Sequence, residues 1–423
     1  MNTHIIKNWD TVARTDERVD ALSIVEAGLD AINTKKSIKE KISVKDDILF
    51  VDNHQFNLKD FDKIVVFAFG KASIDSTLAL EEVLGYRINH GIGIDKRNYE
   101  GLGIKIFEGT HPYPSLANVS ISTKIADTAN ALTEKDLAIV VVSGGGSALL
   151  CYPESECDQG NILYDEFLKS GGGVRDLNII RKHLSDIKGG GLAKMLYPAT
   201  VISLILCDVP GGYNEDVASG PTFKDNSTVD DAKKLLKKFN IKEDFTFNET
   251  SKEDKYFEKV YNVSVLSNVK ALEAMKVKAE GLGYDTFILG AELYDKPEEI
   301  IKKMMDNLKS NTVVLAGGEP SIMITKKGGN GGRNEHSALW ALELIHDDSL
   351  FISIASDGID NKSKYAGVVV DKETIKEVRE KNLNEQEAKE NFNEEPFFLQ
   401  TTDLIETGPT GSNVSDLFLL LKK

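Results

Sequence analysis

Short runs of β-branched and other apolar residues recur along the chain, and a small or acidic turn follows each of them. Because almost every position in these runs is apolar, they predict strands that are buried on both faces, as in parallel or mixed sheets. The predicted strands are Ile64–Phe69, Leu137–Val142, Val201–Leu206, Val263–Leu266, Thr312–Ala316 and Phe351–Ala355.

Stretches with helical spacing of apolar residues separate many of these strands. They are Ala72–Leu84, Leu116–Leu132, Asn178–Leu196, Val269–Leu282 and Pro297–Leu308. Strands that alternate with helices are typical of an α/β fold. In open α/β sheets ligands bind at the carboxyl ends of the strands, where the small and acidic turns of this chain lie.

The chain has 423 residues, which is enough for two or three domains. The charged stretch 224–259 predicts a surface helix followed by a loop, and residues 312–423 carry strands and glycine turns of their own. We therefore predict a larger N-terminal α/β domain over residues 1–300 and a smaller C-terminal α/β domain over residues 311–423. An N-terminal helix is expected to pack onto the larger domain, and the alternation at Ser321–Thr325 favours a hairpin.

Composition narrows the class of protein. Lys and Arg number 51 against 67 Asp and Glu, a net charge of −16, which disfavours non-specific binding to nucleic acid but not the binding of a small anion by clustered cations. The three cysteines form no CxxC pair, so we expect neither a disulfide framework nor a zinc site. So few cysteines are typical of a protein in the reducing cytoplasm, which is the compartment we expect. No apolar run is long enough for a bilayer, and the polar N-terminus does not resemble a signal peptide.

The strongest local signal is the loop Ser143–Gly144–Gly145–Gly146–Ser147, which follows a predicted strand. Glycine lets backbone N–H groups approach an anion without a clash from Cβ, so the loop predicts a phosphate cradle. The alternative is a tight turn without a ligand. The loop is neither a Walker A sequence nor a GxGxxG fingerprint.

Several cations lie near glycines. Lys71 follows Gly70 at the start of a predicted helix, a place that the helix dipole makes unfavourable for a lysine without a function. Further along, Arg181 and Lys188 share one face of a predicted helix and could serve an anion site, although such stripes are more often solvated. His183, on the same stretch, is expected to be structural.

Four glycines in residues 328–332 come just before Arg333, so a closely approached loop could deliver its guanidinium to a carboxylate or phosphate, unless it is only a hairpin tip. Asp208 and Asp357 each follow an apolar strand, where carboxylates often hold Mg²⁺ or accept a proton. Asx turns and helix caps are the alternatives for these aspartates, and Glu319 after Gly317–Gly318 has the same ambiguity.

Short sequence blocks follow one another along the chain from about residue 62 to residue 416. They are Gly70–Ala72, Gly109–Pro114, Ser143–Leu150, Arg181–Ser185, Lys188–Gly190, Ser219–Thr222, Gly317–Pro320, Gly331–Asn334, Asp357–Asp360 and Gly408–Val414. Taken in this order, the blocks resemble the type 2 glycerate kinases, the glycerate 2-kinase family whose C-terminal part is called the MOFRL domain.

The resemblance implies transfer of the γ-phosphoryl group of ATP to the C2 hydroxyl of D-glycerate, which gives 2-phosphoglycerate. It also implies a Rossmann-like N-terminal domain that faces the smaller domain across an active-site cleft. Lys71 and Arg333 correspond to the family's catalytic cations, and the loop 143–147 corresponds to its ATP phosphate site.

A mechanistic hypothesis adds roles for the other candidates. Lys188 would bring further positive charge to the nucleotide, and Arg181 and Glu319 would bind substrate together with Lys71 and Arg333. Asp208 and Asp357 would hold Mg²⁺, and one of the two would act as the base. Both are kept for either role.

The chain departs from the family pattern at a few positions. In the stretch Cys207–Gly212, Gly212 stands where the family usually has a second acid, so Asp208 is the remaining acidic candidate there. Asn361 stands where the family usually has a glycine. Three other functions stay open: a hydroxypyruvate reductase, a kinase for another sugar acid, and a catalytically silent nucleotide-binding homologue. The family also makes a homodimer plausible.

Overall fold

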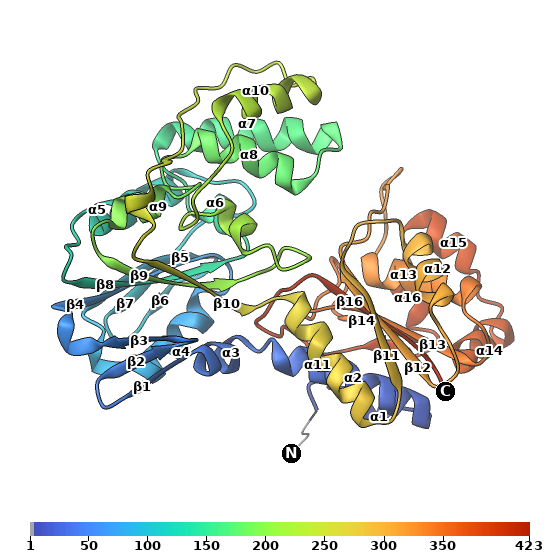
Figure 1. Cartoon of the computed structure of the whole chain (residues 1–423). Helices are drawn as coiled ribbons and strands as arrows, with labels where there is room; N and C mark the ends of the chain where they lie inside the picture. The colour runs from blue at the N-terminus through green and yellow to red at the C-terminus, as the bar shows by residue number, and fades with distance from the viewer. Residues whose placement is uncertain (1–3) are drawn as a thin grey trace. The chain divides into compact units, whose positions relative to one another are not determined.

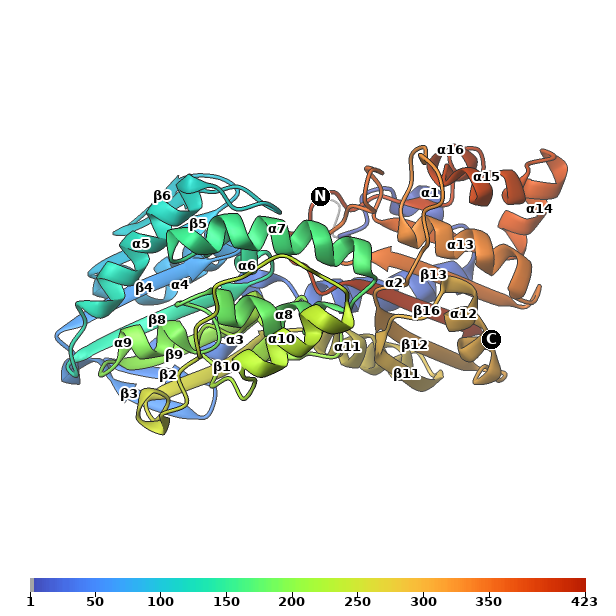
Figure 2. The same cartoon turned by 90° about the horizontal axis from the view of Figure 1, so that it is seen from above.

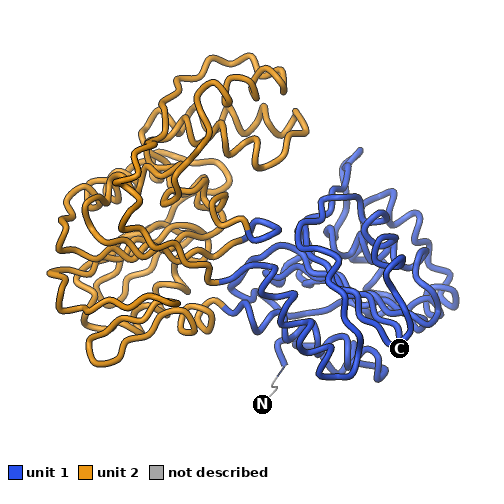
Figure 3. Tube along the Cα trace, viewed as in Figure 1, with its two compact units in different colours: residues 1–33, 208–212, 266–423 blue, residues 34–207, 213–265 orange. Residues whose placement is uncertain are grey.

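The computed structural model describes residues 4–423, which divide into two compact units (Figure 3). Unit 1 contains the chain up to residue 33 together with residues 208–212 and 266–423. Unit 2 contains residues 34–207 and 213–265. Each unit is an α/β structure with its own main sheet, so the predicted fold class is confirmed.

A seven-stranded sheet forms the centre of unit 2 (Figure 1). Its order is β10-β9-β8-β4-β5-β7-β6, and the four pairs from β9 to β7 are parallel. The strands are β4 (Lys63–Phe69), β5 (His90–Asp95), β6 (Tyr99–Glu100), β7 (Ile104–Glu108), β8 (Asp136–Ser143), β9 (Thr200–Leu206) and β10 (Val260–Leu266). Every residue of β8 is buried, as expected for a central parallel strand.

Helices cover both faces of this sheet, and a small antiparallel sheet of β1 (Ile42–Lys45), β2 (Ile48–Val51) and β3 (His54–Asn57) lies near α3 and α4 (Figures 1 and 2). A separate apolar cluster joins α7, α8 and α10. The helices of unit 2 are α3 (Thr34–Lys41), α4 (Ser73–Leu84), α5 (Leu116–Asn130), α6 (Gly146–Leu149), α7 (Glu154–Ser170), α8 (Val174–Leu184), α9 (Gly191–Leu196) and α10 (Val229–Lys238).

Unit 1 is built on a six-stranded sheet of order β11-β12-β16-β13-β14-β15. Only β11 and β12 pair in parallel, and the C-terminal strand β16 lies antiparallel between β12 and β13. The strands are β11 (Asp285–Leu293), β12 (Thr312–Gly318), β13 (Ser349–Ala355), β14 (Gly367–Val370), β15 (Leu404–Ile405) and β16 (Asp416–Lys422).

Two groups of helices enclose the sheet of unit 1. The first group, α2 and α11, packs together and on the sheet, and α12, α13 and α14 contact the sheet through a different apolar cluster. The helices are α1 (Trp9–Val12), α2 (Asp16–Ala31), α11 (Asn268–Gly281), α12 (Pro297–Asp306), α13 (Arg333–Leu344), α14 (Lys372–Glu380), α15 (Glu385–Asn391) and α16 (Glu394–Phe398). Among the described residues, no helix combines the length and apolar character needed to cross a bilayer.

The order of the strands in unit 2 creates a switch point between β4 and β8. The chain continues from β4 outward through β5 and β7, and then returns to the other side of β4 to form β8 and β9. The loops after two such strands run apart and leave room for a ligand at the carboxyl ends. The two loops are those of Gly70–Lys71 and Ser143–Ser147, which the sequence had singled out.

The predicted strands agree with the structure better than the predicted long helix and hairpin do. The six predicted strands are all present, with boundaries extended by up to three residues. The predicted helix Asn178–Leu196 is wrong, because α8 ends at Leu184, where Ser185 is extended, and α9 begins at Gly191. The predicted hairpin at Ser321–Thr325 is also wrong, since no strand forms there.

The N-terminal helix and the division of the chain also differ from expectation. Helix α2 packs on α11 in unit 1, and its buried Arg18 makes ion pairs with Asp371 and Asp403. The compact units separate at residues 265 and 266 instead of between 300 and 311, because β11 pairs with β12. Pairing between distant strands and helices decides both features, and apolar spacing does not reveal it.

Candidate active site

The loop after β8 presents backbone N–H groups that have no internal acceptor. Among the described residues, nothing accepts a hydrogen bond from the N–H groups of Gly144, Gly145 and Gly146. Gly145 has φ of +81°, a left-handed conformation that glycine adopts without strain. The first N–H groups of a helix lack internal acceptors, and three in a row at a glycine turn can bind an anion, so the loop has the chemistry of an anion cradle. Helix α6 has four residues and adds little dipole.

The neighbouring loop brings Lys71 directly against this cradle. The Lys71 N–H donates to the Gly144 carbonyl oxygen at 2.9 Å, and the Ala72 N–H donates to Ser143 Oγ at 3.2 Å. A Cβ on Gly145 would lie 3.0 Å from Lys71 Cε. The Lys71 side chain is exposed, and its Nζ has no acceptor among the residues that the structure describes.

His111 joins the same group, although the sequence analysis did not select it. Its Cδ2 would lie 3.2 Å from a Cβ on Gly145. Burial, together with the nearby charges of Lys71, Lys96 and Arg181, lowers the pKa of His111 to about 4. The imidazole is therefore neutral at pH 7. The signal available in the sequence was its place in the Gly109–Pro114 block.

Arg181 lies on α8 and lines a small hollow together with Ser147 and Pro112. Its guanidinium stands 5.6 Å from the ring centroid of Tyr164, and within residues 4–423 it has no carboxylate partner. Burial lowers the pKa of Arg181, since the charge is partly withdrawn from water. Glu156, which lines the same hollow, opposes this shift from a distance but makes no ion pair with Arg181, so the guanidinium can still contact an anionic ligand.

Lys188 does not fit the predicted phosphate-binding role. Its side chain is fully buried, and its Nζ donates to the Leu150 carbonyl oxygen at 2.7 Å and to the Glu156 carboxylate. Because α8 ends at Leu184, Lys188 is not on the helical face that it was expected to share with Arg181. Burial raises the pKa of Glu156 in spite of this lysine. The pair belongs to the core that supports the cradle.

We predict that Lys188→Met lowers the free energy of unfolding by roughly 3 kcal/mol, because it leaves the Glu156 carboxyl buried without its cation. Chemical unfolding followed by circular dichroism measures the loss. The double variant with Glu156→Leu should recover much of the stability, since both charges are then absent.

A matched control is Lys169→Met, which removes an exposed lysine paired with Glu166 and should leave the unfolding midpoint unchanged. If Lys188→Met were as stable as the wild-type chain and instead raised the KM for a nucleotide, Lys188 would be a binding residue after all.

His183 is structural as expected, because its ring nitrogens contact the Asn248 carbonyl oxygen and Ser227 Oγ.

In unit 1, the acidic candidate residues lie at one end of three adjacent strands, β12, β16 and β13. Asp416 begins β16 and lies opposite both Gly318 at the end of β12 and Ala355 at the end of β13. The turns after those strands carry Glu319 and Asp357. This antiparallel register places acids from three distant parts of the sequence at one end of the sheet.

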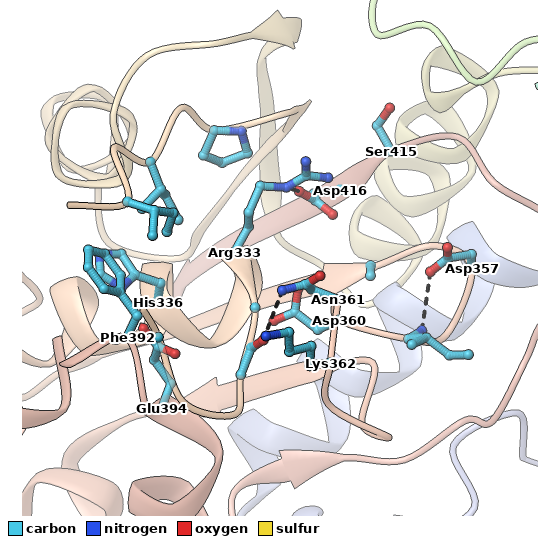
Figure 4. Close-up of a pocket in the computed structure, with 18 of the residues that line it drawn as sticks. Arg333, His336, Asp357, Asp360, Asn361, Lys362, Phe392, Glu394, Ser415 and Asp416 are labelled. Carbon is cyan, nitrogen blue, oxygen red and sulfur yellow. Dashed lines mark hydrogen bonds and ion pairs between the residues drawn. The ribbon is translucent and has the colours of Figure 1, made fainter. Parts of the chain in front are cut away.

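Arg333 is the first residue of α13 and points into this group (Figure 4). Its Nε donates to Asp416 Oδ2 at 3.0 Å, and its Nη1 donates to Glu319. Burial opposes the charge, yet the carboxylates of Asp416 and Glu319 raise the pKa of the Arg333 guanidinium. Arg333 lines a cavity of about 700 Å³ together with Asp357 and Asp416.

Buried polar groups hold this end of the unit in place. Asn334 Nδ2 donates to Asp416 Oδ1 at 2.9 Å and to Asp360 Oδ1 at 3.1 Å, and its Oδ1 accepts from Ser353 Oγ at 2.6 Å. Burial raises the pKa of Asp416 to about 7 and that of Asp360 to about 6. The sequence did not select Asp416 or Asn334 as site residues, because their roles depend on strand register.

Glu335, which lies close to the glycine loop before Arg333, is an unusually buried acid. Both carboxyl oxygens of Glu335 are buried and have no hydrogen-bond partner among the described residues. Burial raises the pKa of Glu335 to about 9, so the group is protonated at pH 7. A Cβ on Gly331 would lie 3.1 Å from Glu335 Oε2, and Gly331 has φ of +142°, which explains why the loop before Arg333 requires glycine there.

Asp208 and Asp357 both fall in unit 1. Asp357 Oδ1 accepts from the Ile359 N–H at 3.2 Å, the local turn that was the alternative interpretation (Figure 4). The backbone oxygen of Asp208 accepts from Ser415 Oγ at 2.8 Å, next to Asp416. Asn361 has φ of +55°, which confirms that it takes a turn conformation usual for glycine.

The available donor groups limit the kind of metal site that the chain can form. Within residues 4–423, no group of three or more His, Cys, Asp or Glu side chains has the arrangement of a metal site. Mg²⁺ is usually held by one or two carboxylates together with phosphate oxygens and water. Asp208 and Asp357 fit that limited role and could not form a closed protein cage.

Comparisons with known proteins agree with this description. Residues 20–249 match a domain of unknown function called DUF4147, and residues 312–416 match the MOFRL family. A glycerate 2-kinase of Pyrococcus horikoshii is 31% identical over 96% of this chain and 97% of its own length. A D-glycerate 2-kinase of Thermotoga maritima is 30% identical over 94% of this chain and 97% of its own.

Solved structures give the same result. The crystal structure of glycerate kinase from Thermotoga maritima aligns with a TM-score of 0.80 and 28% identity, and covers 96% of this chain and 99% of that one. A Pyrococcus horikoshii crystal structure aligns with a TM-score of 0.80 and 29% identity over 97% of this chain and 99% of that one. A protein of Agrobacterium vitis named a putative hydroxypyruvate reductase is 30% identical over 85% of this chain.

The two α/β units and their relatives define the class of protein as a kinase. Within that class, the chain belongs to the glycerate 2-kinase family, with the MOFRL region at its C-terminal end. The resemblance predicted from the ordered sequence blocks is therefore confirmed.

Proposed function

We propose that this kinase transfers the γ-phosphoryl group of ATP to the C2 hydroxyl of D-glycerate and releases 2-phosphoglycerate. The observation that supports this best is the set of three unpartnered N–H groups at Gly144–Gly146 beside the unpaired Lys71. In a chain with a net charge of −16, cations without acidic partners at a switch point favour a polyanionic ligand.

The residues have separable roles in this proposal. The loop N–H groups bind phosphate oxygens, and Lys71 neutralises charge on the phosphoryl group in transfer, because this reaction depends on positioning and charge more than on covalent chemistry. Arg181 adds a second cation and contacts the substrate. Arg333 of unit 1 binds an anionic group of a substrate.

The aspartates of unit 1 complete the proposal. When bound with ATP, Mg²⁺ would neutralise phosphate charge, and Asp208 and Asp357 are the residues that would hold it. One of these two carboxylates accepts the proton of the C2 hydroxyl as that oxygen attacks phosphorus. The neutral imidazole of His111 adds no positive charge beside Lys71 at pH 7.

The test is to incubate the protein with Mg-ATP and D-glycerate and to identify the product by phosphorus NMR. We expect 2-phosphoglycerate, and no 3-phosphoglycerate, to form with stoichiometric ADP. A parallel reaction with hydroxypyruvate and NADH addresses the name carried by some relatives. NADH oxidation without phosphoglycerate would overturn the proposal, and so would ATP binding without any product.

A further inference from the structure

Two carboxylates hold the guanidinium of Arg333, and their surroundings differ sharply. Asp416 contacts Nε, and only 3% of its side chain is exposed. Glu319 contacts Nη1, and 45% of its side chain is exposed. Asn334 also donates to Asp416, whereas no described residue other than Arg333 donates to the Glu319 carboxylate. Asp416 is therefore fixed, and Glu319 is tethered at one point.

The nitrogens that these acids occupy decide how Arg333 can bind an anion. A guanidinium makes paired contacts through two forks, one formed by Nε and Nη2 and the other by Nη1 and Nη2. Asp416 blocks the first fork. Glu319 contacts Nη1 of the second fork, and Nη2 has no partner among residues 4–423. A phosphate or carboxylate can make a paired contact with Arg333 only if one acid leaves.

Glu319 is the acid that can leave. Its exposed carboxylate becomes hydrated when it swings away, and exposed ion pairs contribute little to stability. Removing the Asp416 carboxylate from Arg333 would instead leave a charge buried without its cation. The backbone N–H of Glu319 donates to the Leu293 carbonyl oxygen at 2.8 Å, so the main chain can stay in place while the side chain moves.

Building on the proposed function, we propose that Glu319 is an internal competitor of the substrate at Arg333. Its carboxylate contacts Nη1, one nitrogen of the Nη1–Nη2 fork, and an anionic group of the substrate replaces it there. This role has the opposite sign to the direct substrate contact that the sequence suggested for Glu319. A direct contact would make its loss weaken binding, whereas a competitor makes its loss strengthen binding.

The test is Glu319→Gln, measured by calorimetric titration with D-glycerate and with inorganic pyrophosphate at fixed ionic strength. We expect at least one ligand to bind about two- to fivefold more tightly, the range set by an exposed ion pair. In steady-state assays the KM of the corresponding substrate should fall by a similar factor, with kcat within about twofold of wild type. Weaker binding of either ligand, or no change in both, would overturn the proposal.

Two variants separate contact from general charge. Glu319→Asp keeps the charge but withdraws the carboxylate from Nη1, so it should tighten binding as the glutamine variant does. If it binds like wild type, repulsion rather than occupation explains the effect, and the proposal is wrong. Glu299→Gln removes an exposed acid in the first turn of α12 and should change nothing.

Calorimetry does not require turnover, so the two proposals can fail separately. Tighter anion binding by Glu319→Gln in a protein that makes no 2-phosphoglycerate would reject the proposed function and retain the competitor. Normal product formation with unchanged anion binding in both Glu319 variants would do the reverse.

Discussion

We expect replacement of Lys71 by alanine to lower kcat about 10³-fold and to leave the unfolding midpoint unchanged. The magnitude is that expected when a group aimed at developing charge is removed from a transition state. Stability is unaffected because the Lys71 side chain is exposed and its Nζ contacts no acceptor among the described residues. Rates with Mg-ATP and D-glycerate, beside urea unfolding curves, measure both effects.

The matched control is Lys63→Ala, which removes an exposed lysine at the opposite end of the same strand β4. It should keep wild-type kcat, since the carboxyl ends of the strands, and not their beginnings, carry the anion cradle. Near-full turnover by the Lys71 variant would show that the cradle acts without this cation and would remove the main support for its assigned role.

We expect replacement of Arg333 by alanine to lower kcat by about 10³-fold or more, the effect of losing an arginine that stabilises a phosphoryl group in transfer. This variant also loses stability, because Asp416 is buried and Arg333 supplies its cation. Arg333→Lys separates the two effects. Its ammonium keeps a positive charge near Asp416 and recovers stability, whereas a point charge cannot form the paired contacts of a guanidinium, so kcat stays low.

Unfolding curves and kcat for both Arg333 variants provide the measurement. An exposed arginine at the end of α14, Arg379, gives the control, and Arg379→Ala should match the wild-type chain in both. If Arg333→Lys turned over at the wild-type rate, paired recognition by the guanidinium would play no part in the reaction, and the competitor role of Glu319 would lose its basis as well.

Prediction from sequence was reliable where a residue's role depends on its immediate neighbours in the chain. In the triglycine loop, Gly145 adopts a left-handed conformation that favours glycine. Lys71 was selected because a cation is unfavourable at the start of a helix, and its side chain indeed lacks a partner among the described residues. Both arguments use only local backbone chemistry.

Prediction was unreliable where continuity of a helix had to be assumed. Lys188 was assigned to phosphate because it follows Arg181 at helical spacing, but the chain turns at Ser185 and directs Lys188 to Glu156. The choice between a solvated lysine and a buried ion pair depends on a carboxylate more than thirty positions away. No periodicity within the segment contains that information.

The sequence by itself predicted six of the strands, the α/β class, the triglycine loop and the family, because each follows from local apolar pattern or from short motifs in a fixed order. Only the tertiary structure decided that Asp416 fixes Arg333, that Glu319 contacts its Nη1, and that α2 packs on α11. These contacts join residues that are far apart in the sequence and are brought together by strand register and helix packing. Local sequence patterns contain no information about such contacts.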